Sequence, residues 1–467
     1  MPSSVCLRRL SLAPSDLTAH AMASRSLLAY TQTASFSQSA PLSAKPGQGK
    51  PAGPARGERT LNLGKNKKVQ RDMGKRPAPG ERKALRKRVV LSNTNALVVE
   101  GLNDLTVGNI ETGDMQGQVV GLSEPVIDSL RAVEAFKATQ GWHLFRRPAM
   151  LMRRETTQVS ALMRDVETRK KTVRRILAGD RASGKSTLLL QGLAMAFMKK
   201  WVVISIPDAK DIVSAHTEYA PLPGSNPLQY TQNAYTANLL AQIAKANSEV
   251  LSKLLPGTDL KLPIPTNRIT TLADLAVLGS KNPELSWPIF NALWTELTQP
   301  GRPPIMLAVD GLAHMMAPSA YLSAEAKPIH AHDLVVVRHF VDHLSGKSAL
   351  PNGGMVLAAT SGSNQPGSPA LKFSVQLAEA RAQGATDLPM WNPYQLVDQR
   401  VMEVLKDVDT LKLHGLDKRD ARTIMEYYAA SGMLRKQVDE PLVSQWWTLA
   451  GNGNIGELEK GSVKMRA

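Results

Sequence analysis

Eight consecutive residues, 179–186, have the spacing of a phosphate-binding loop (P-loop): a glycine, four further residues, then glycine, lysine and serine. The two glycines allow the backbone to turn tightly, so that successive N–H groups can point at phosphate oxygens. In this pattern the lysine reaches the β- and γ-phosphates, and the serine hydroxyl ligates Mg²⁺. The sequence therefore predicts a site for a nucleoside di- or triphosphate. The predicted contacts are Gly179, Asp180, Arg181, Ala182, Ser183, Gly184, Lys185, Ser186 and Thr187.

The segments that flank this loop predict a strand before it and a helix after it. Residues 173–178 can form the strand, and residues 186–200, rich in Leu, Ala and Met, predict the helix. Such a helix aims its positive N-terminal end at a bound anion. The pair Arg174-Arg175 is unusual in this strand, because a central parallel strand is ordinarily apolar on both faces.

A carboxylate that could share the metal ion follows a second apolar run. Residues 304–310 predict a buried strand ending in Asp310, which would hold Mg²⁺ together with Ser186. The alternative is that Asp310 only caps the turn into Gly311. ATPases of the AAA+ type usually carry Glu directly after this Asp, where it activates water, and Gly311 cannot do so. We therefore expect nucleotide binding with at most slow hydrolysis, and we predict no catalytic residue.

A third predicted strand, residues 354–361, ends in two hydroxyl groups. In P-loop ATPases a polar side chain at such a strand end often senses the γ-phosphate, and Thr360 or Ser361 could do so. Alternatively, these hydroxyls cap the exit of the strand into the Gly-Ser-Asn segment that follows. The residues alone leave both interpretations open.

Alternating helices and strands favour an α/β fold with a parallel sheet. From about residue 396 the chain is predicted to be helical, without a sheet signal. The other predicted elements are helices over 124–139, 155–171 and 235–254, a strand over 201–207, and a helix that begins after Asp417 and ends at Gly432. The predicted organisation is a transit peptide over 1–45, a basic flexible extension over 46–92, an N-terminal segment over 93–150 packing on the nucleotide domain, a P-loop domain over 151–395, and a helical region over 396–467.

Composition limits the class of protein. No stretch reaches the ~18 uninterrupted apolar residues that a membrane span needs, so we expect none. The single cysteine, Cys6, lies in a segment predicted to be removed, which excludes a disulfide or a thiolate metal site in the mature chain. The net charge of +17 is concentrated at one end: residues 1–90 contain 18 Lys/Arg and 4 Asp/Glu, and the remaining residues contain 39 and 36.

The basic N-terminal region has two parts. Residues 1–50 are rich in Ser and Ala and carry arginines and lysines against one acid, Asp16, which is typical of a mitochondrial transit peptide. The alternative is a disordered tail without a targeting role. Residues 56–88 are basic and poor in apolar residues, so they suit electrostatic binding to a phosphate backbone. The alternative there is a solvated linker, because aromatic residues for base stacking are lacking.

Several separated motifs resemble the death-associated protein 3 family of mitochondrial small-subunit ribosomal proteins. The resemblance covers roughly residues 95–460. Its motifs are Gly117-Gln118-Val119-Val120-Gly121-Leu122, Ala135-Phe136-Lys137, Trp142-His143-Leu144-Phe145-Arg146-Arg147-Pro148, Ile206-Pro207-Asp208-Ala209, Val309-Asp310-Gly311 and Glu426-Tyr427-Tyr428. The P-loop alone is generic, whereas the stretch from Trp142 to Pro148 joined to Val-Asp-Gly is more particular.

The resemblance implies an AAA+-like P-loop NTPase domain in the small subunit of the mitochondrial ribosome, in the matrix. The implied partners are small-subunit ribosomal RNA and neighbouring ribosomal proteins, with the large subunit as a further contact across the interface. The family is described as GTP-binding, so the expected cofactors are GTP/GDP or ATP with Mg²⁺. The chain has no Asn-Lys-x-Asp motif that reads guanine, so the base stays open.

Two other functions compete with a nucleotide-binding ribosomal scaffold. A matrix AAA+ ATPase or remodelling enzyme should carry a catalytic Glu and an arginine finger, and Gly311 counts against it. A translational GTPase needs switch regions and a guanine-reading motif, and neither is recognisable. The scaffold is therefore the leading hypothesis.

Overall fold

The computed structural model describes residues 89–257, 262–263, 269–363 and 365–464. The chain divides into two units, residues 1–76 and 77–467, and all described residues belong to the second. The predicted transit peptide and the basic segment 56–88 lie outside the described residues. The P-loop and Asp310 lie inside them.

A five-stranded sheet forms the centre of the second unit, and each pairing in it is parallel. The three strands β10, β7 and β4 are buried along their whole length, which explains their uninterrupted apolar sequences. In spatial order the strands are β11 (Asp409–Leu413), β3 (Thr172–Gly179), β10 (Gly354–Ala359), β7 (Ile305–Asp310) and β4 (Val202–Ile206).

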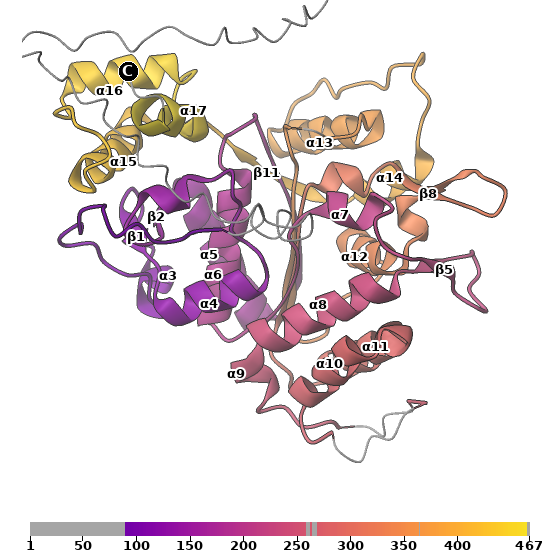
Figure 1. Ribbon diagram of the computed structural model, residues 1–467. Coiled ribbons are helices and arrows are strands. Elements are labelled where there is room, and N and C mark those ends of the chain that lie inside the picture. The colour runs from indigo at the N-terminus through magenta and orange to yellow at the C-terminus, as the bar shows by residue number, and fades with distance from the viewer. Residues whose placement is uncertain (1–88, 258–261, 264–268, 364, 465–467) are drawn as a thin grey trace, which may run out of the picture. The chain divides into compact units, whose positions relative to one another are not determined.

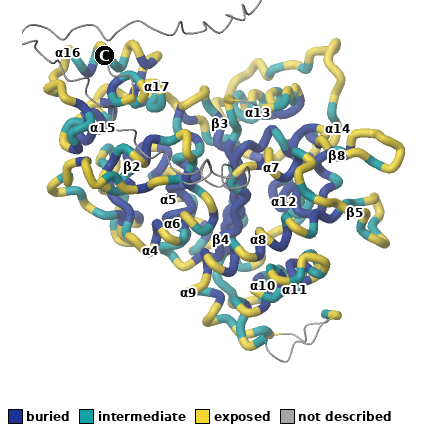
Figure 2. The backbone as a smooth tube through the Cα atoms, viewed as in Figure 1, coloured by how far each residue is buried: buried dark blue, intermediate teal, exposed yellow. Residues whose placement is uncertain are grey.

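Helices cover both faces of this sheet, which is seen edge-on in Figure 1. Each face has its own cluster of buried apolar side chains, so the sheet separates two cores (Figure 2). One face carries α4 (Glu124–Ala132), α5 (Arg154–Arg169) and α6 (Lys185–Met198). The other carries α7 (Ala209–Val213), α8 (Asn233–Ala246), α10 (Leu272–Lys281), α11 (Ser286–Leu297), α12 (Val335–Ser345), α13 (Pro369–Ala382) and α14 (Gln399–Leu405).

A third apolar cluster joins the segment before the sheet to the end of the chain. Phe145 stacks on Tyr428 with ring centroids 5.6 Å apart, and Tyr427 lies beside both rings. The elements around this cluster are β1 (Val119–Gly121), the 3-10 helix η2 (Gly141–Leu144), β2 (Ala149–Leu151), α15 (Lys418–Ala430), α16 (Glu440–Leu449), α17 (Ile455–Glu459) and the π-helix η6 (Lys460–Lys464).

The remaining elements are short. They are α3 (Val107–Thr112), β5 (Ala220–Pro221), β6 (Tyr230–Thr231), α9 (Ser248–Leu251), η3 (Pro283–Leu285), η4 (Leu312–His314), β8 (Pro318–Leu322), β9 (Pro328–His330) and η5 (Ala331–Asp333). In the part of the chain that the structure describes, no helix has both the length and the apolar composition of a membrane span.

The α/β fold with a parallel sheet is confirmed, and so are the strands and helices predicted around the loop 179–186. Strand β3 ends at Gly179 and helix α6 begins at Lys185. Helix α15 begins after Asp417, as predicted, although the Asp417 side chain makes no capping hydrogen bond. Gly432 follows this helix in a left-handed conformation, with φ of +76°.

The helix predicted over 124–139 was wrong in its length, because α4 ends at Ala132. Glu134 adopts a left-handed conformation, with φ of +52°. Its N–H donates to the carbonyl of Arg131, and the N–H of Ala135 donates to that of Leu130. This hydrogen-bond pair ends a helix efficiently but ordinarily uses glycine, so the local residue types contain little signal for it.

The long helix predicted over 235–254 is two helices, α8 and α9, which meet at Asn247. The Asn247 side chain accepts a hydrogen bond from the N–H of Val203 at 2.7 Å and donates one to its carbonyl at 2.8 Å. Val203 lies on β4, the edge strand of the sheet, whose outer backbone groups need partners. The break between α8 and α9 therefore places the Asn247 side chain where it hydrogen-bonds the outer backbone groups of the edge strand β4.

The prediction that no strand follows residue 396 was wrong, because β11 extends the sheet beside β3. Its sequence, Asp-Thr-Leu-Lys-Leu, is half polar, as suits an edge strand that is only partly buried. The charged residues of β3 have partners on β11 and on α12. Arg175 forms an ion pair with Asp409, and Arg174 Nε donates to the carbonyl of His343 at 3.0 Å.

Candidate nucleotide-binding site

The predicted phosphate-binding loop connects β3 to α6 and requires glycine at both ends. Gly179 has φ of +143° and Gly184 has φ of +96°, a region that side chains with Cβ rarely adopt. A Cβ atom on Gly179 would also lie 2.7 Å from the carbonyl oxygen of Leu413, on the neighbouring strand β11. The loop backbone is thus fixed by the sheet as well as by its own glycines.

The ammonium group of Lys185 lies within the loop. Lys185 Nζ donates to the carbonyl oxygens of Gly179 at 2.8 Å and of Asp180 at 2.5 Å. Burial lowers the pKa of Lys185, and the carboxylates of Asp180 and Asp310 oppose that shift. A phosphate would give this cation an anionic acceptor instead of neutral carbonyls.

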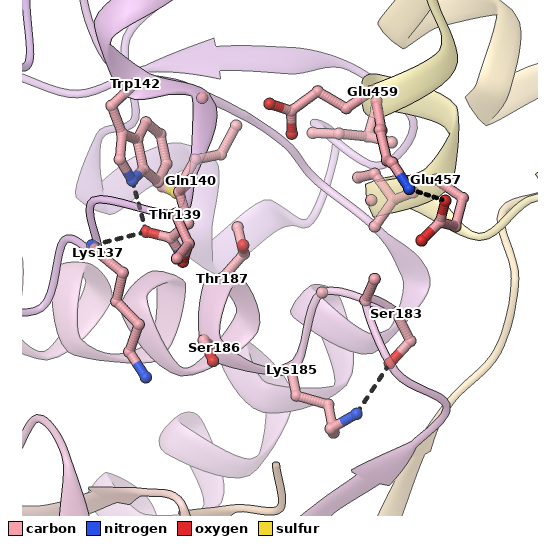
Figure 3. A pocket seen from close by; sticks show the side chains of 18 of the residues that line it. Lys137, Thr139, Gln140, Trp142, Ser183, Lys185, Ser186, Thr187, Glu457 and Glu459 are labelled. Atoms are coloured by element: carbon pink, nitrogen blue, oxygen red, sulfur yellow. Dashed lines mark hydrogen bonds and ion pairs between the residues drawn. The ribbon is translucent and has the colours of Figure 1, made fainter. Parts of the chain in front are cut away.

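The loop forms one wall of a cavity of about 510 Å³ (Figure 3), within the range of small-molecule sites. The strand end at residues 360–363 lines the cavity as well, and Gly362 lies directly against Arg181 of the loop. Two further walls come from distant parts of the chain, residues 137–151 before the sheet and residues 455–464 at its end. Of the predicted contacts, Arg181 to Thr187 line this cavity, whereas Gly179, Asp180 and Asp310 are not among its lining residues.

Asp310 ends β7 and is 4 % exposed. It pairs in register with Ala359 on β10, the strand between β7 and the P-loop strand. Its Oδ2 atom forms an ion pair with Lys137 Nζ, and no other described residue donates a hydrogen bond to that oxygen. The prediction that Asp310 merely caps a turn does not describe this contact, because the carboxylate reaches a residue of the N-terminal segment.

The oxygen donors present fit Mg²⁺, which proteins usually hold by one or two carboxylates together with substrate phosphates. Ser186 offers a hydroxyl and Asp310 a buried carboxylate. Among the described residues no group of three or more His, Cys, Asp or Glu side chains is placed to hold a metal ion. A metal at this site would therefore depend on the nucleotide phosphates, whose negative charge it would neutralise.

The residue after Asp310 cannot easily be a catalytic carboxylate. Gly311 has φ of +84°, and its N–H donates to the carbonyl of Ala359 at 3.0 Å. A Glu at this position would be strained in the same backbone conformation. The observed backbone therefore favours the glycine that the sequence carries, and slow hydrolysis stays a prediction.

The two hydroxyl groups at the end of β10 make local hydrogen bonds. Thr360 Oγ1 donates to the carbonyl of Leu177 on β3 at 3.0 Å, and Ser361 Oγ donates to that of Ser363 at 3.0 Å. Both hydroxyl groups therefore cap the exit of β10, as the alternative interpretation predicted. Because both also line the cavity, a role in sensing phosphate stays a prediction.

Arg153 was not predicted from the sequence, although its guanidinium group hydrogen-bonds the backbone of the P-loop. Arg153 Nη1 donates to the carbonyl of Ser183 at 2.7 Å, and Nη2 donates to that of His414 at 2.5 Å. The side chain is buried and also forms an ion pair with Glu155 at 3.3 Å. Burial lowers the pKa of Arg153, while Glu155 opposes that shift. Nothing in the local sequence distinguishes this arginine from its exposed neighbours.

Sequence reasoning also missed the contribution of the last helices to the loop. The N–H of Gly456 donates to the carbonyl of Ala182 at 3.0 Å, and Asn454 Nδ2 donates to that of Arg181 at 2.7 Å. These contacts span more than half of the chain, and no motif signals them. The predicted helical region over 396–467 is thus in direct contact with the P-loop.

Aromatic side chains also line the cavity. They are Trp142, Phe145, Tyr427 and Tyr428, and burial raises the pKa of Tyr427 to about 12. Aromatic faces can stack on nucleobases. The cavity lining therefore combines the predicted phosphate-binding loop with aromatic surface.

Comparisons with known proteins identify the family. The family model described as mitochondrial ribosomal death-associated protein 3 matches residues 150–461, which include the P-loop, Asp310 and Gly456. The chain belongs to this family. The resemblance seen in the sequence is thereby confirmed, and with it the mitochondrial ribosome as the location.

Two curated relatives of the same name extend this family match. The chain is 46 % identical over 397 residues to small ribosomal subunit protein mS29 of Neurospora crassa, covering 84 % of each chain. It is 23 % identical over 337 residues to small ribosomal subunit protein mS29 of Schizosaccharomyces pombe, covering 70 % of this chain and 67 % of the relative. The family model begins at residue 150, so Lys137 and Trp142, which line the cavity, precede the matched segment.

Proposed function

We propose that this chain is a structural component of the small subunit of the mitochondrial ribosome and that it binds a purine nucleotide with Mg²⁺. The relatives are named as small-subunit ribosomal proteins, which supports the first part. Its partners are then small-subunit ribosomal RNA and neighbouring ribosomal proteins, with the large subunit as a further contact. Residues 56–88 would supply electrostatic binding to RNA.

The observation that carries the nucleotide proposal is the composition of the cavity walls. A loop of P-loop sequence and four aromatic side chains line one space, and Lys137, which also lines it, pairs with the buried carboxylate of Asp310 at the end of β7. The bound species is GTP/GDP or ATP, held at its phosphates by residues 179–187, with Ser186 and Asp310 holding the Mg²⁺ ion. An AAA+-like P-loop domain is the fold class that this arrangement supports best.

The nucleotide is proposed to act as a structural ligand. Three segments far apart in the sequence line the cavity: residues 137–151, the loop 181–187 and residues 455–464. A ligand that contacts all three stabilises their arrangement, by about 2.7 kcal/mol when its concentration is a hundred times Kd. The side chain that would have to activate water is missing, because Gly311 stands in its place.

Three experiments test this proposal. Sucrose-gradient fractionation of mitochondrial ribosomes should place the chain with the small subunit, and a peak elsewhere would contradict that assignment. Isothermal titration with guanosine and adenosine nucleotides in Mg²⁺ should show binding that Lys185→Ala abolishes. Turnover by the isolated wild-type protein should stay far below the rate of about 1 s⁻¹ or faster that is typical of enzymes. Efficient turnover would instead support the alternative, an AAA+ ATPase of the matrix.

A further inference from the structure

The cation closest to Asp310 comes from neither the P-loop nor the sheet. Lys137 lies between α4 and η2, in the segment that precedes the sheet, and its Nζ atom forms the ion pair with Asp310. The Asp310 side chain is 5 % exposed and that of Lys137 is 32 % exposed. Because no other described residue donates to Asp310 Oδ2, Lys137 supplies the positive charge that this buried carboxylate needs.

The turn that carries Lys137 is anchored to the wall of the cavity. The N–H of Lys137 donates to Gln140 Oε1 at 2.9 Å, and Trp142 Nε1 donates to the same oxygen at 2.5 Å. Phe136 packs edge-on against Trp142, with ring centroids 5.3 Å apart. The backbone at Lys137 is therefore fixed, whereas its four-carbon stem can rotate. Figure 3 shows this stem reaching into the cavity on the side of Ser186.

The other lysines of the cavity are engaged elsewhere. Lys185 Nζ donates to carbonyls within the loop. Lys460 pairs with Glu457 at 3.4 Å, and Lys464 pairs with Glu459 at 3.0 Å. Lys137 differs from these because its carboxylate partner lies at the end of β7, beside the strands that position the P-loop.

We propose that Lys137 contacts the terminal phosphate of a bound nucleoside triphosphate and makes the site prefer triphosphates to diphosphates. This inference rests on the proposed nucleotide site. In P-loop proteins the loop serine and the strand-end carboxylate flank the γ-phosphate end of the nucleotide. A terminal phosphate there would add negative charge beside the buried Asp310, and the ammonium of Lys137 would neutralise part of that charge together with the Mg²⁺ that Ser186 and Asp310 would hold. When a diphosphate is bound, Lys137 keeps its ion pair with Asp310 and makes no contact that stabilises the diphosphate.

The test compares affinities of the full-length protein for non-hydrolysable triphosphates and for diphosphates, guanosine and adenosine forms alike, at one fixed Mg²⁺ concentration. Lys137→Met keeps the aliphatic stem and removes the charge. It should weaken triphosphate binding by about 10- to 100-fold, the loss of one charge-assisted hydrogen bond, and change diphosphate binding less than about threefold. Lys137→Arg should retain the preference.

Lys412→Met is the matched control. Lys412 lies on β11, pairs with Glu379 of α13 at 2.7 Å, and does not line the cavity. It should bind both nucleotides like the wild type. If Lys137→Met weakens both nucleotides equally, or neither, the inference is wrong while the proposed function stands. If the wild type binds no nucleotide, the proposed function is wrong and the inference falls with it.

Amine labelling of the wild-type protein gives a second measurement that needs no folded variant. Bound triphosphate should slow acetylation of Lys137, followed by mass spectrometry, several-fold more than bound diphosphate does. Equal labelling rates with the two nucleotides, both at saturating concentration, would overturn the inference. Lys412 serves as the internal reference, because its labelling rate should not depend on the nucleotide.

Discussion

Replacement of Arg153 by methionine should destabilise the protein strongly. The substitution removes two hydrogen bonds to backbone carbonyls, those of Ser183 and His414, and leaves Glu155 without its cation. The side chains of the pair are 8 % and 11 % exposed, so solvent can replace little of what is lost. Breaking a buried ion pair by removing one partner costs about 3–5 kcal/mol, and we expect the free energy of unfolding to fall by about that amount.

A second substitution separates the unpaired charge from the lost packing. The double variant Arg153→Met, Glu155→Gln has no buried charge at either position. The amide oxygen of the introduced glutamine can still accept from the N–H of His414, which lies 3.3 Å from Glu155 Oε1. The double variant should recover at least about 1 kcal/mol relative to Arg153→Met alone. Urea denaturation followed by tryptophan fluorescence measures both values.

The same substitution at an exposed position controls for the loss of an arginine in general. Arg400 pairs with Asp333 at 3.1 Å, and the Arg400 side chain is 59 % exposed. Arg400→Met should cost much less than Arg153→Met, because water screens an exposed pair. Equal costs for the two variants, or a double variant no more stable than Arg153→Met, would refute the reasoning.

Three further predictions concern other parts of the molecule. Gly456→Ala places a Cβ 2.7 Å from that of Ala182 and should weaken nucleotide binding in titrations, whereas Gly367→Ala, which meets no atom within 4 Å, should not. Burial lowers the pKa of His332 to about 3, so the unfolded chain binds its proton first as the pH falls below about 6.5. The contribution of His332 to the free energy of unfolding should therefore fall by about 1.4 kcal/mol for each pH unit between about 6.5 and 4. Urea denaturation of His332→Gln should show a shallower dependence of stability on pH. Deletion of residues 56–88 should flatten the log–log salt dependence of RNA binding, and an unchanged slope would exclude them as the RNA contact.

The elements around the P-loop could be predicted because local rules determine them. Strands β3, β4, β7 and β10 are short apolar runs separated by amphipathic or apolar helices, and the loop carries its own signature. Strand β11 could not be predicted in the same way. Its half-polar sequence, Asp409–Leu413, becomes a strand because β3 offers it a free edge and Arg175 offers Asp409 a cation. These partners lie more than 200 residues away in the sequence.

The candidate site shows the same division. Its predicted phosphate-binding loop is a contiguous motif, and Asp310 ends a recognisable buried strand. The other half consists of single residues that tertiary packing brings to the loop, such as Arg153, Lys137 and Gly456. Each is an ordinary residue in its local sequence. Their roles depend on contacts with Ser183, Asp310 and Ala182 that only the folded chain creates.

The most direct test of the central claim is the nucleotide content of purified small subunits. Subunits that carry the wild-type chain and subunits that carry Lys185→Ala are isolated on sucrose gradients, denatured, and their released nucleotides quantified by mass spectrometry. The account predicts one additional guanosine or adenosine nucleotide per wild-type subunit, absent from the variant. Equal nucleotide content in the two preparations, with the variant chain present in both, would contradict the claim that this P-loop holds a structural nucleotide.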